Sequence, residues 1–456
     1  MYQTRNNKEK LWLFIKIFLP ILIYQFANYS ASFIDTMMTG QYSTMDLAGV
    51  SMATSLWNPL FSFLTGIVSA LVPIIAQYLG KGERDKIREE FHQFVYLAIG
   101  LTILLLCSVL FIAVPALAQF GLDESVFQVG RQYLYFISIG ILPLLLFSVC
   151  RSFFDALGLT QLSMYLMLLL VPFNSLFNYL LIYGKMSLPA LGGAGAGLGT
   201  ALAYWAVLLV IVIVMCKNKT IASYQIWQWS PIDLSLLKEG LKIGLPIGLQ
   251  VFAEVAIFAV VGLYMAKFSA QIIAAHQSAM NFATLLYAFP ASVSSALAIV
   301  IAYEVGAKRP QDVKAYSRLG RLVALGFAGL TLTFLYFFRS KVAYLYGNDA
   351  EFIRLTSHFL SFALMFQLAD AFTAPIQGIL RGYKDTTVPF ILGLVAYWSM
   401  TFPVAFLLER FIQMGPEAYW IGLISGIFVC GIALNLRLIK IAHFFLSCEN
   451  ILLMLK

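Results

Sequence analysis

Residues 241–265, LKIGLPIGLQVFAEVAIFAVVGLYM, point directly to the class of fold, because they hold only one basic residue, near the start, and one acidic residue, Glu254. A helix needs about 20 apolar residues to cross the hydrocarbon core of a bilayer, and this stretch is long enough. Its proline is no objection, since membrane helices tolerate proline. The stretch therefore predicts a membrane-spanning helix.

The whole chain has the composition of a membrane protein. Its 456 residues are 61% hydrophobic and 11% charged, whereas soluble domains are nearer half apolar and a quarter charged. The net charge of +8 does not indicate nucleic-acid binding, because the basic residues lie in short loops between apolar runs. The five cysteines and four histidines are scattered, which argues against a disulfide framework or a metal motif.

Twelve apolar runs are long enough to cross a membrane. A signal peptide is the alternative for the first run, but the run is too long for one and has a counterpart inside the chain. The spacings Gly195/Gly199 and Gly422/Gly426 suit close helix packing. The predicted spans are 12–36, 47–78, 92–115, 129–152, 161–183, 193–216, 240–266, 275–304, 318–338, 354–380, 388–409 and 418–444.

Lysine and arginine concentrate in alternate loops, and basic loops stay in the cytoplasm. We therefore expect both termini and the even-numbered loops to be cytoplasmic, with the ninth loop (Arg339, Lys341, Arg354) as a mild exception. The basic residues stand at the N-terminus (Arg5, Lys8, Lys10) and in the second (Lys81, Arg84, Lys86, Arg88), sixth (Lys217, Lys219, Lys238, Lys242) and eighth (Lys308, Arg309, Lys314) loops.

The two halves of the chain are similar at one fixed offset. Sliding the second half back by 226 positions (246 − 20 = 226) places Pro246 on Pro20 and Ser295-Ala296-Leu297 on Ser69-Ala70-Leu71. The loop residues Gly347 and Asp349 then meet Gly121 and Asp123. Matches of proline, glycine and aspartate at one offset, loops included, indicate an internal repeat.

Each half holds six spans, so both halves enter the membrane from the same side and form a parallel repeat. The predicted fold is an all-α integral membrane protein with twelve transmembrane helices in two six-helix lobes around a central cavity. We expect an N-terminal lobe over 1–216, a cytoplasmic linker over 217–239 and a C-terminal lobe over 240–456. This organisation is typical of alternating-access transporters.

Three carboxylates in the predicted spans stand out, because a charge inside the membrane is costly and therefore indicates function. Glu304 and Glu409 stand at the ends of their spans, are expected at the membrane interface and receive no function. Glu254 is about 14 residues, or roughly 21 Å, into its helix, and Asp370 is about ten residues, or roughly 15 Å, from a helix end. A structural role is the alternative for both, and a solvated helix end is the alternative for Asp35. The repeat aligns Glu254 with Asn28 and Asp35 with Val261. The two halves therefore share a scaffold but carry their charged residues at different positions. This difference favours a specialised site in each half over a purely structural role.

Other side chains have weaker signals. Arg151 and Asp155 are four residues apart and are expected to form an ion pair at a helix end. Aromatic residues make up 15% of the chain, and Tyr287 and Phe366 are candidates for lining the cavity.

Six motifs resemble the multidrug and toxic-compound extrusion (MATE) family, in particular its bacterial NorM-like branch. Their order and spacing match over nearly the whole chain. They are DTMMTG (35–40), VPIIAQYLGKG (72–82), PFNSLFNYLLIYGK (172–185), LPIGLQVFAEVAIFAV (245–260), AAHQSAMNF (274–282) and LRGYKDT (380–386).

The resemblance implies an antiporter that expels cationic, often aromatic, compounds in exchange for inward sodium or protons, with two lobes forming a V. It implies a cation site at Glu254 and Asp370, where sodium would bind. In the N-terminal lobe it implies a polar cluster of Asp35, Asn174 and Asn178.

One position departs from the family pattern. Related sequences can carry a tyrosine four residues before the tenth-helix aspartate, where this chain has Phe366. A hydroxyl ligand is therefore missing at that position of the predicted cation site.

The sequence predicts a transporter and not an enzyme. We expect no cofactor, small cationic drugs or dyes and membrane lipid as partners, no nucleic acid, a functional monomer, and a bacterial inner or plasma membrane. A flippase of the same wider superfamily is the main alternative, but its anionic substrate would need buried basic residues, and only Lys16 lies deep in a span. A lipid-modifying enzyme would need a convergent catalytic set, which the sequence does not contain.

Overall fold

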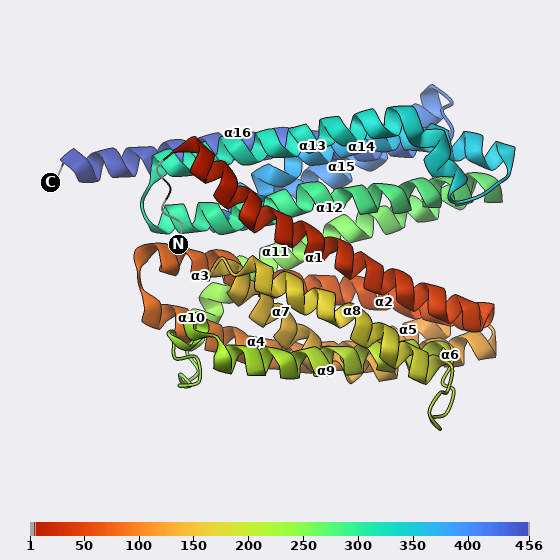
Figure 1. Ribbon diagram of the computed structural model, residues 1–456. Coiled ribbons are helices and arrows are strands. Elements are labelled where there is room, and N and C mark those ends of the chain that lie inside the picture. Colours follow the sequence, from red (N-terminus) through yellow and green to blue (C-terminus); the bar gives the residue numbers. More distant parts are fainter. Residues whose placement is uncertain (1–3, 5, 455–456) are drawn as a thin grey trace. The chain divides into compact units, whose positions relative to one another are not determined.

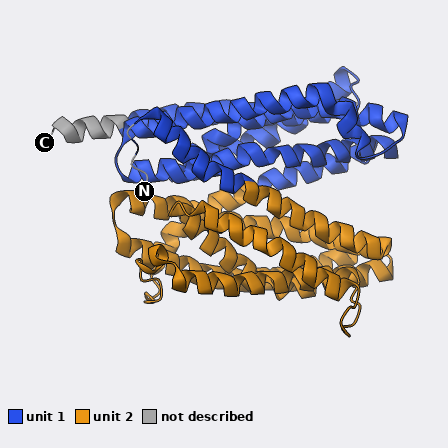
Figure 2. Ribbon diagram, viewed as in Figure 1, with its two compact units in different colours: residues 1–22, 253–456 blue, residues 23–252 orange. Residues whose placement is uncertain are grey.

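The computed structural model describes residues 4 and 6–454, with side chains through residue 445, and every regular element in that part is a helix (Figure 1). Arg5 and the side chain of Cys448 lie outside the described residues. The chain forms two compact units, which are residues 1–22 with 253–456 (unit 1) and residues 23–252 (unit 2) (Figure 2).

Unit 2 contains most of α1 (Asn7–Tyr42), the first part of α11 (Leu234–Met265) and all the helices between them. Within it, α8 packs on α9, and α2 packs on α6. The intervening helices are α2 (Thr44–Val68), α3 (Leu71–Lys81), α4 (Arg84–Ser108), the π-helix η1 (Val109–Ala113), α5 (Val114–Gln119), α6 (Glu124–Ser138), α7 (Ile141–Ala156), α8 (Thr160–Ile182), α9 (Gly193–Lys217) and α10 (Lys219–Ala222).

Unit 1 contains the rest of α11 and five longer helices. Its centre is built by α12 and α14, which pack along each other, and α15 packs on α16. These helices are α12 (Ala270–Gly306), α13 (Pro310–Tyr344), α14 (Ala350–Gly382), α15 (Thr387–Phe411) and α16 (Glu417–Met454).

The described part of the chain holds 11 helices long and apolar enough to cross a membrane, or up to 12 when α6 and α7, bent by 51°, count as one span. Each falls on one of the predicted runs, so the prediction of twelve membrane spans is confirmed. The halves differ in continuity. The chain between α2 and α3 breaks at Ser69 and Ala70, whereas the repeat partners Ser295 and Ala296 lie inside the unbroken α12.

The predicted small-residue packing is also present. A Cβ atom on Gly199 of α9 would lie 2.2 Å from Oδ1 of Asn178 on α8, and one on Gly422 of α16 would lie 2.4 Å from the carbonyl oxygen of Thr401 on α15. Only glycine lets these helices approach so closely. The close packing of α8 and α9 also places the backbone of α9 beside Asn178, a polar side chain of the candidate site.

The compact units differ from the predicted lobes in two segments. Residues 7–22 of α1 belong to unit 1, and residues 240–252 of α11 belong to unit 2, as does the whole linker 217–239. Contacts explain the first segment, because Lys10 pairs with Asp312 at 3.0 Å and the ring of Phe18 lies 5.4 Å from that of Phe327. The lobes follow sequence similarity and the units follow packing, so the lobe boundaries stay a prediction.

Candidate functional site

Unit 1 contains the two carboxylates that the sequence singled out. Glu254 lies on α11 and is half-buried, and Asp370 lies on α14 and is buried, with 8% of its surface exposed. The two are close enough for their charges to interact. The fold therefore brings together two acidic residues that are far apart in the sequence.

Glu254 and Asp370 have different surroundings. The Oε1 atom of Glu254 accepts hydrogen bonds from Nε2 of Gln377 (3.2 Å) and from the hydroxyl of Tyr397 (3.4 Å). The Oδ2 atom of Asp370, in contrast, is buried and has no hydrogen-bond partner. A buried polar atom without a partner costs about 1–3 kcal/mol. A bound cation would give this oxygen a partner, and a proton on the carboxyl group would remove its charge.

Sequence reasoning missed Gln377 and Tyr397. Gln377 stands seven residues after Asp370, and two helical turns put both on one face of α14, so helical spacing could have found it. Tyr397 comes from α15, and nothing in its sequence context marks it. Its hydroxyl approaches the pair from a different helix than the one that carries Phe366.

The two predicted cavity aromatics lie near this group of residues. Phe366 is buried on α14, where its ring lies 5.8 Å from that of Phe258 and 6.4 Å from that of Trp420. Tyr287 is half-buried on α12 and lies within electrostatic range of Tyr397. Phe366 therefore fills an aromatic cluster one helical turn before Asp370.

Unit 2 contains the predicted polar cluster. Asn178 of α8 donates from Nδ2 to Oδ1 of Asp35 on α1, and also to Oδ1 of Asn174 at 3.3 Å. Thr200 of α9 donates to Oδ2 of Asp35 at 3.3 Å and accepts from Nδ2 of Asn174 at 3.0 Å. The structure thus brings the three predicted residues together and adds Thr200.

The cluster is well enclosed on its asparagine side. Asn174 and Asn178 are buried, whereas Asp35 is half-buried, and Oδ1 of Asn178 has no hydrogen-bond partner. Asp35 therefore accepts hydrogen bonds from two helices, α8 and α9. Thr200 was missed because a single threonine after a glycine-rich run has no distinguishing spacing.

Arg151 and Asp155 form the expected i,i+4 ion pair at 3.4 Å, and the Arg151 guanidinium also lies over the ring of Tyr24 at 4.9 Å. The prediction of an ion pair is confirmed. The charges of Arg151 and Asp155 are paired with each other within unit 2.

The chain matches a known protein family along both halves. The sequence profile of the MatE family matches residues 20–180 and again residues 246–407. The two matches begin at Pro20 and Pro246, the prolines that the internal repeat aligns.

Similar proteins cover nearly the whole chain. A protein of Streptococcus pneumoniae named probable multidrug resistance protein NorM is 61% identical over 98% of this chain and 99% of its own, and a Bacillus subtilis protein of the same name is 43% identical over 97% and 98%. The Vibrio cholerae MATE transporter VcmN in its bent form has a similar fold, with a TM-score of 0.85, 18% identity, and coverage of 98% of this chain and 99% of that one.

A crystal structure of a MATE protein in complex with MaL6 has a TM-score of 0.87 at 16% identity, covering 97% of this chain and 98% of that one. Such low identities support the fold, whereas the full-length relatives and the repeated profile match support the family. This chain therefore belongs to the MATE family, in its NorM branch, and is a multi-pass transporter of a bacterial membrane and not an enzyme.

Proposed function

We propose that the chain exports lipophilic, aromatic cations in exchange for sodium ions that move inward, by alternating access. The observation that carries this proposal is the Glu254–Asp370 pair, in which a buried carboxylate oxygen of Asp370 has no hydrogen-bond partner. Two acidic groups in a poorly solvated site cannot both stay bare, so a cation or a proton must neutralise them. Binding and releasing such a cation or proton is what an ion-coupling site does.

Multidrug export is supported by the names of the full-length relatives. Lipophilic cations suit acidic residues combined with aromatic rings, because both attract positive charge. The partners are therefore small cationic drugs or dyes, with membrane lipid around the protein. The proposed transporter acts as a monomer in the bacterial inner or plasma membrane and needs no cofactor, since the ion gradient supplies the free energy.

Sodium is favoured over the proton as the coupling ion. The pair offers the carboxylate oxygens of Glu254 and Asp370, with the Tyr397 hydroxyl beside them, and hard cations prefer oxygen ligands. A single carboxyl group would be enough to carry a proton, so the presence of two carboxylates favours sodium.

A flippase for an anionic lipid-linked precursor is the competing proposal. Such a substrate would need buried, available basic groups. Among the described residues, Lys10 is the one Lys or Arg that is buried, and it pairs with Asp312. Lys16 is exposed and lies over the ring of Trp12 at 5.1 Å. Loss of an exporter would sensitise cells to cationic dyes, whereas loss of a flippase would disturb the cell envelope.

Purified protein in lipid vesicles tests the proposal directly. Sodium and pH gradients are imposed separately, and movement of a fluorescent cationic dye is followed. We expect a sodium gradient to drive dye transport against its own gradient. Dye movement that neither gradient drives would contradict antiport, and transport driven equally well by pH without sodium would contradict sodium coupling.

Orientation gives a further prediction. Contacts within each unit support a common side for the basic segments, since Lys10 pairs with Asp312 and Arg88 donates to Gln228. In intact cells, a cysteine at Asp85 or Gln311, exposed neighbours of Glu83 and Asp312, should resist an impermeant thiol reagent.

A cysteine at Gln41, the exposed neighbour of Ser43 in the first loop, should react with the same reagent from outside. Labelling of residue 85 in intact cells would overturn the orientation. Permeabilised cells, in which all three cysteines should react, are the control.

Tyr397→Phe should weaken the apparent affinity for the coupling ion while maximal efflux changes little. The variant removes one hydrogen bond to Glu254, worth about 1 kcal/mol, so the half-maximal ion concentration should rise about fivefold. Tyr346→Phe is the matched control, because its exposed hydroxyl bonds to Asn281. An unchanged ion dependence in Tyr397→Phe would remove this hydroxyl from the site.

A further inference from the structure

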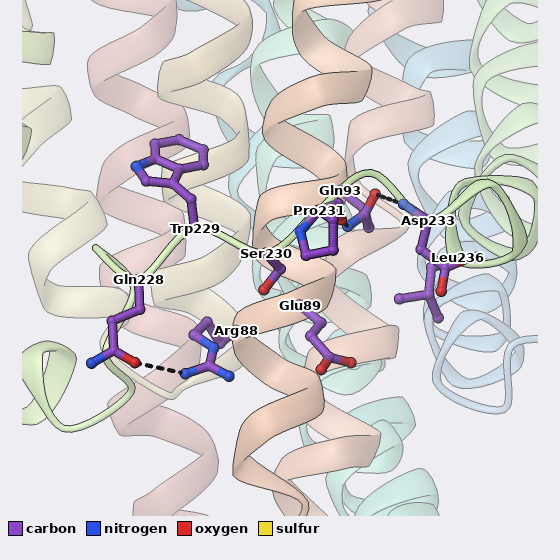
Figure 3. Close-up of a pocket in the computed structure, with 9 residues that line it drawn as sticks. All are labelled: Arg88, Glu89, Gln93, Gln228, Trp229, Ser230, Pro231, Asp233 and Leu236. Carbon is purple, nitrogen blue, oxygen red and sulfur yellow. Dashed lines mark hydrogen bonds between the residues drawn. The ribbon is translucent and has the colours of Figure 1, made fainter.

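The polar segment that joins the two halves of the sequence is held against α4. Its residues 228–231 and 233 line, with Leu236 of α11 and with Arg88, Glu89 and Gln93 of α4, an open pocket of about 380 Å³ (Figure 3). Arg88 donates from Nη1 to Oε1 of Gln228 at 3.3 Å on one side of the pocket. The other fixed points come from His92, Gln93 and Tyr96 of α4.

His92 is fully buried and holds the segment at two backbone positions. Its Nε2 lies 2.7 Å from the carbonyl oxygen of Ile226, and its Nδ1 lies 3.1 Å from the backbone nitrogen of Ser230. A backbone N–H can only donate, so Nδ1 accepts and Nε2 carries the proton. The ring also stacks on Trp229 with centroids 4.8 Å apart.

Gln93 uses both ends of its side-chain amide on the same segment. Nε2 donates to the carbonyl oxygen of Pro231 at 2.9 Å, and Oε1 accepts from the backbone N–H of Asp233 at 2.9 Å. The Tyr96 hydroxyl donates to the carbonyl oxygen of Ser230 at 2.8 Å. Because these bonds go to main-chain atoms, they fix the path of the chain itself.

The attachment continues directly into α11. The Asp233 carboxylate accepts from the backbone N–H of Ser235 at 2.8 Å, and so caps the start of this helix. Farther along, a Cβ on Gly244 would lie 2.5 Å from the carbonyl oxygen of Ile67, and one on Gly248 would lie 2.5 Å from that of Phe63. The backbone of α11 therefore touches that of α2 with no side chain between them.

We infer that residues 226–252 stay attached to unit 2 throughout the transport cycle, so that the joint at this crossing between the units lies in α11 after Phe252 and not in the polar linker. The chain's other crossing lies in α1 after Leu22. Polar linkers are the usual joints between domains. Here the linker is clamped by main-chain hydrogen bonds, and unit 2 ends at Phe252. The clamp made by His92, Gln93 and Tyr96 is therefore a positioning device for α11.

This placement has a consequence for coupling, which rests on the proposed function. Glu254 lies two residues beyond Phe252, and Gln377 and Tyr397 of unit 1 hold its carboxylate. Any change of angle at the joint reaches Glu254 within the same helical turn. Ion binding at Glu254 and Asp370 is thus able to favour one bend angle of α11 at the joint over another.

A covalent staple between the linker and α4 tests the inference. Arg88→Cys and Gln228→Cys are combined in a cysteine-free background that still exports dye, and a short bismaleimide joins them. We expect efflux to stay within about twofold of the unstapled protein, because the two segments already move together. A loss of about tenfold or more would show that the linker must leave α4, and would overturn the inference. Single-cysteine variants with the same reagent are the controls.

A second arm loosens the clamp and then repairs it. Gln93→Leu removes two hydrogen bonds to the linker and should lower efflux about fivefold or more at normal membrane abundance. The 88–228 staple should restore most of that loss. Unimpaired efflux by Gln93→Leu, or a loss that the staple does not relieve, would contradict the positioning role.

Hydrogen exchange gives a readout that does not depend on transport. The backbone amides of Ser230 and Asp233 should exchange slowly with and without dye and sodium, and the Asp233 amide, from which Gln93 accepts, should become fast in Gln93→Leu. Fast exchange in the unmodified protein would overturn the inference even if the antiport proposal holds. Slow exchange in a protein that fails to transport would contradict only the proposed function.

Discussion

Glu254→Gln and Asp370→Asn should each reduce gradient-driven efflux about a hundredfold or more while the protein stays folded and inserted. Each change removes one of the two negative charges that hold the ion, and a hundredfold loss of rate corresponds to about 2.7 kcal/mol of activation free energy. Both changes keep nearly the same volume, so the packing of α11 and α14 should survive. Dye efflux in vesicles, normalised to the amount of protein, is the measurement.

The double variant should be barely worse than either single one, because both residues serve one site and their effects do not add. Glu409→Gln is a matched control, since that carboxylate also belongs to unit 1 but pairs with Lys267 at the helix ends. Full gradient-driven efflux by both single variants would refute the assignment of the site. Loss of efflux in Glu409→Gln as well would point to a general effect of charge.

Asp35→Asn should lower efflux about tenfold without lowering membrane abundance. The variant retains an oxygen that can accept from Asn178, but it removes the negative charge that Asn178 and Thr200 surround. A hydrogen bond to a charged group is worth about 1.5–3 kcal/mol, which corresponds to a loss of this order. Transport and abundance are measured on the same membranes.

Asp123→Asn is the matched control for this prediction, because Asp123 is an exposed carboxylate of the same unit. It should export at the normal rate. Normal efflux by Asp35→Asn would instead support the interpretation of Asp35 as a solvated helix-end residue, with its hydrogen bonds serving only to hold α1 and α8 together.

The location of the acidic residues could be predicted because the membrane makes charge costly. Glu254 and Asp370 stand out as single carboxylates in long apolar runs, and their pairing followed from a family resemblance. The neighbours that complete each group could not be predicted in the same way. Gln377, Tyr397 and Thr200 are uncharged residues that occur in many membrane helices, and their spacing gives no signal beyond one helical face.

The apolar pattern of the sequence is enough to predict the twelve spans, and its fixed offset is enough to predict the internal repeat. In lipid, every backbone polar group must be satisfied within its own segment, so a long apolar run has essentially one available structure, the helix. Pro20 and Pro246 occupy equivalent positions in the two halves because both halves use the same helical scaffold.

Which helices share a unit, and which polar atoms form hydrogen bonds, becomes known only from the packing of the helices. The separation of α1 and α11 between two units, and the clamp of His92 and Gln93 on the linker, depend on contacts between residues far apart in the sequence. Hydropathy measures how well a segment suits lipid, and it is insensitive to the rotation and partners of a helix. Those are set by side-chain packing, close glycine contacts and hydrogen bonds that exist only once the helices have come together.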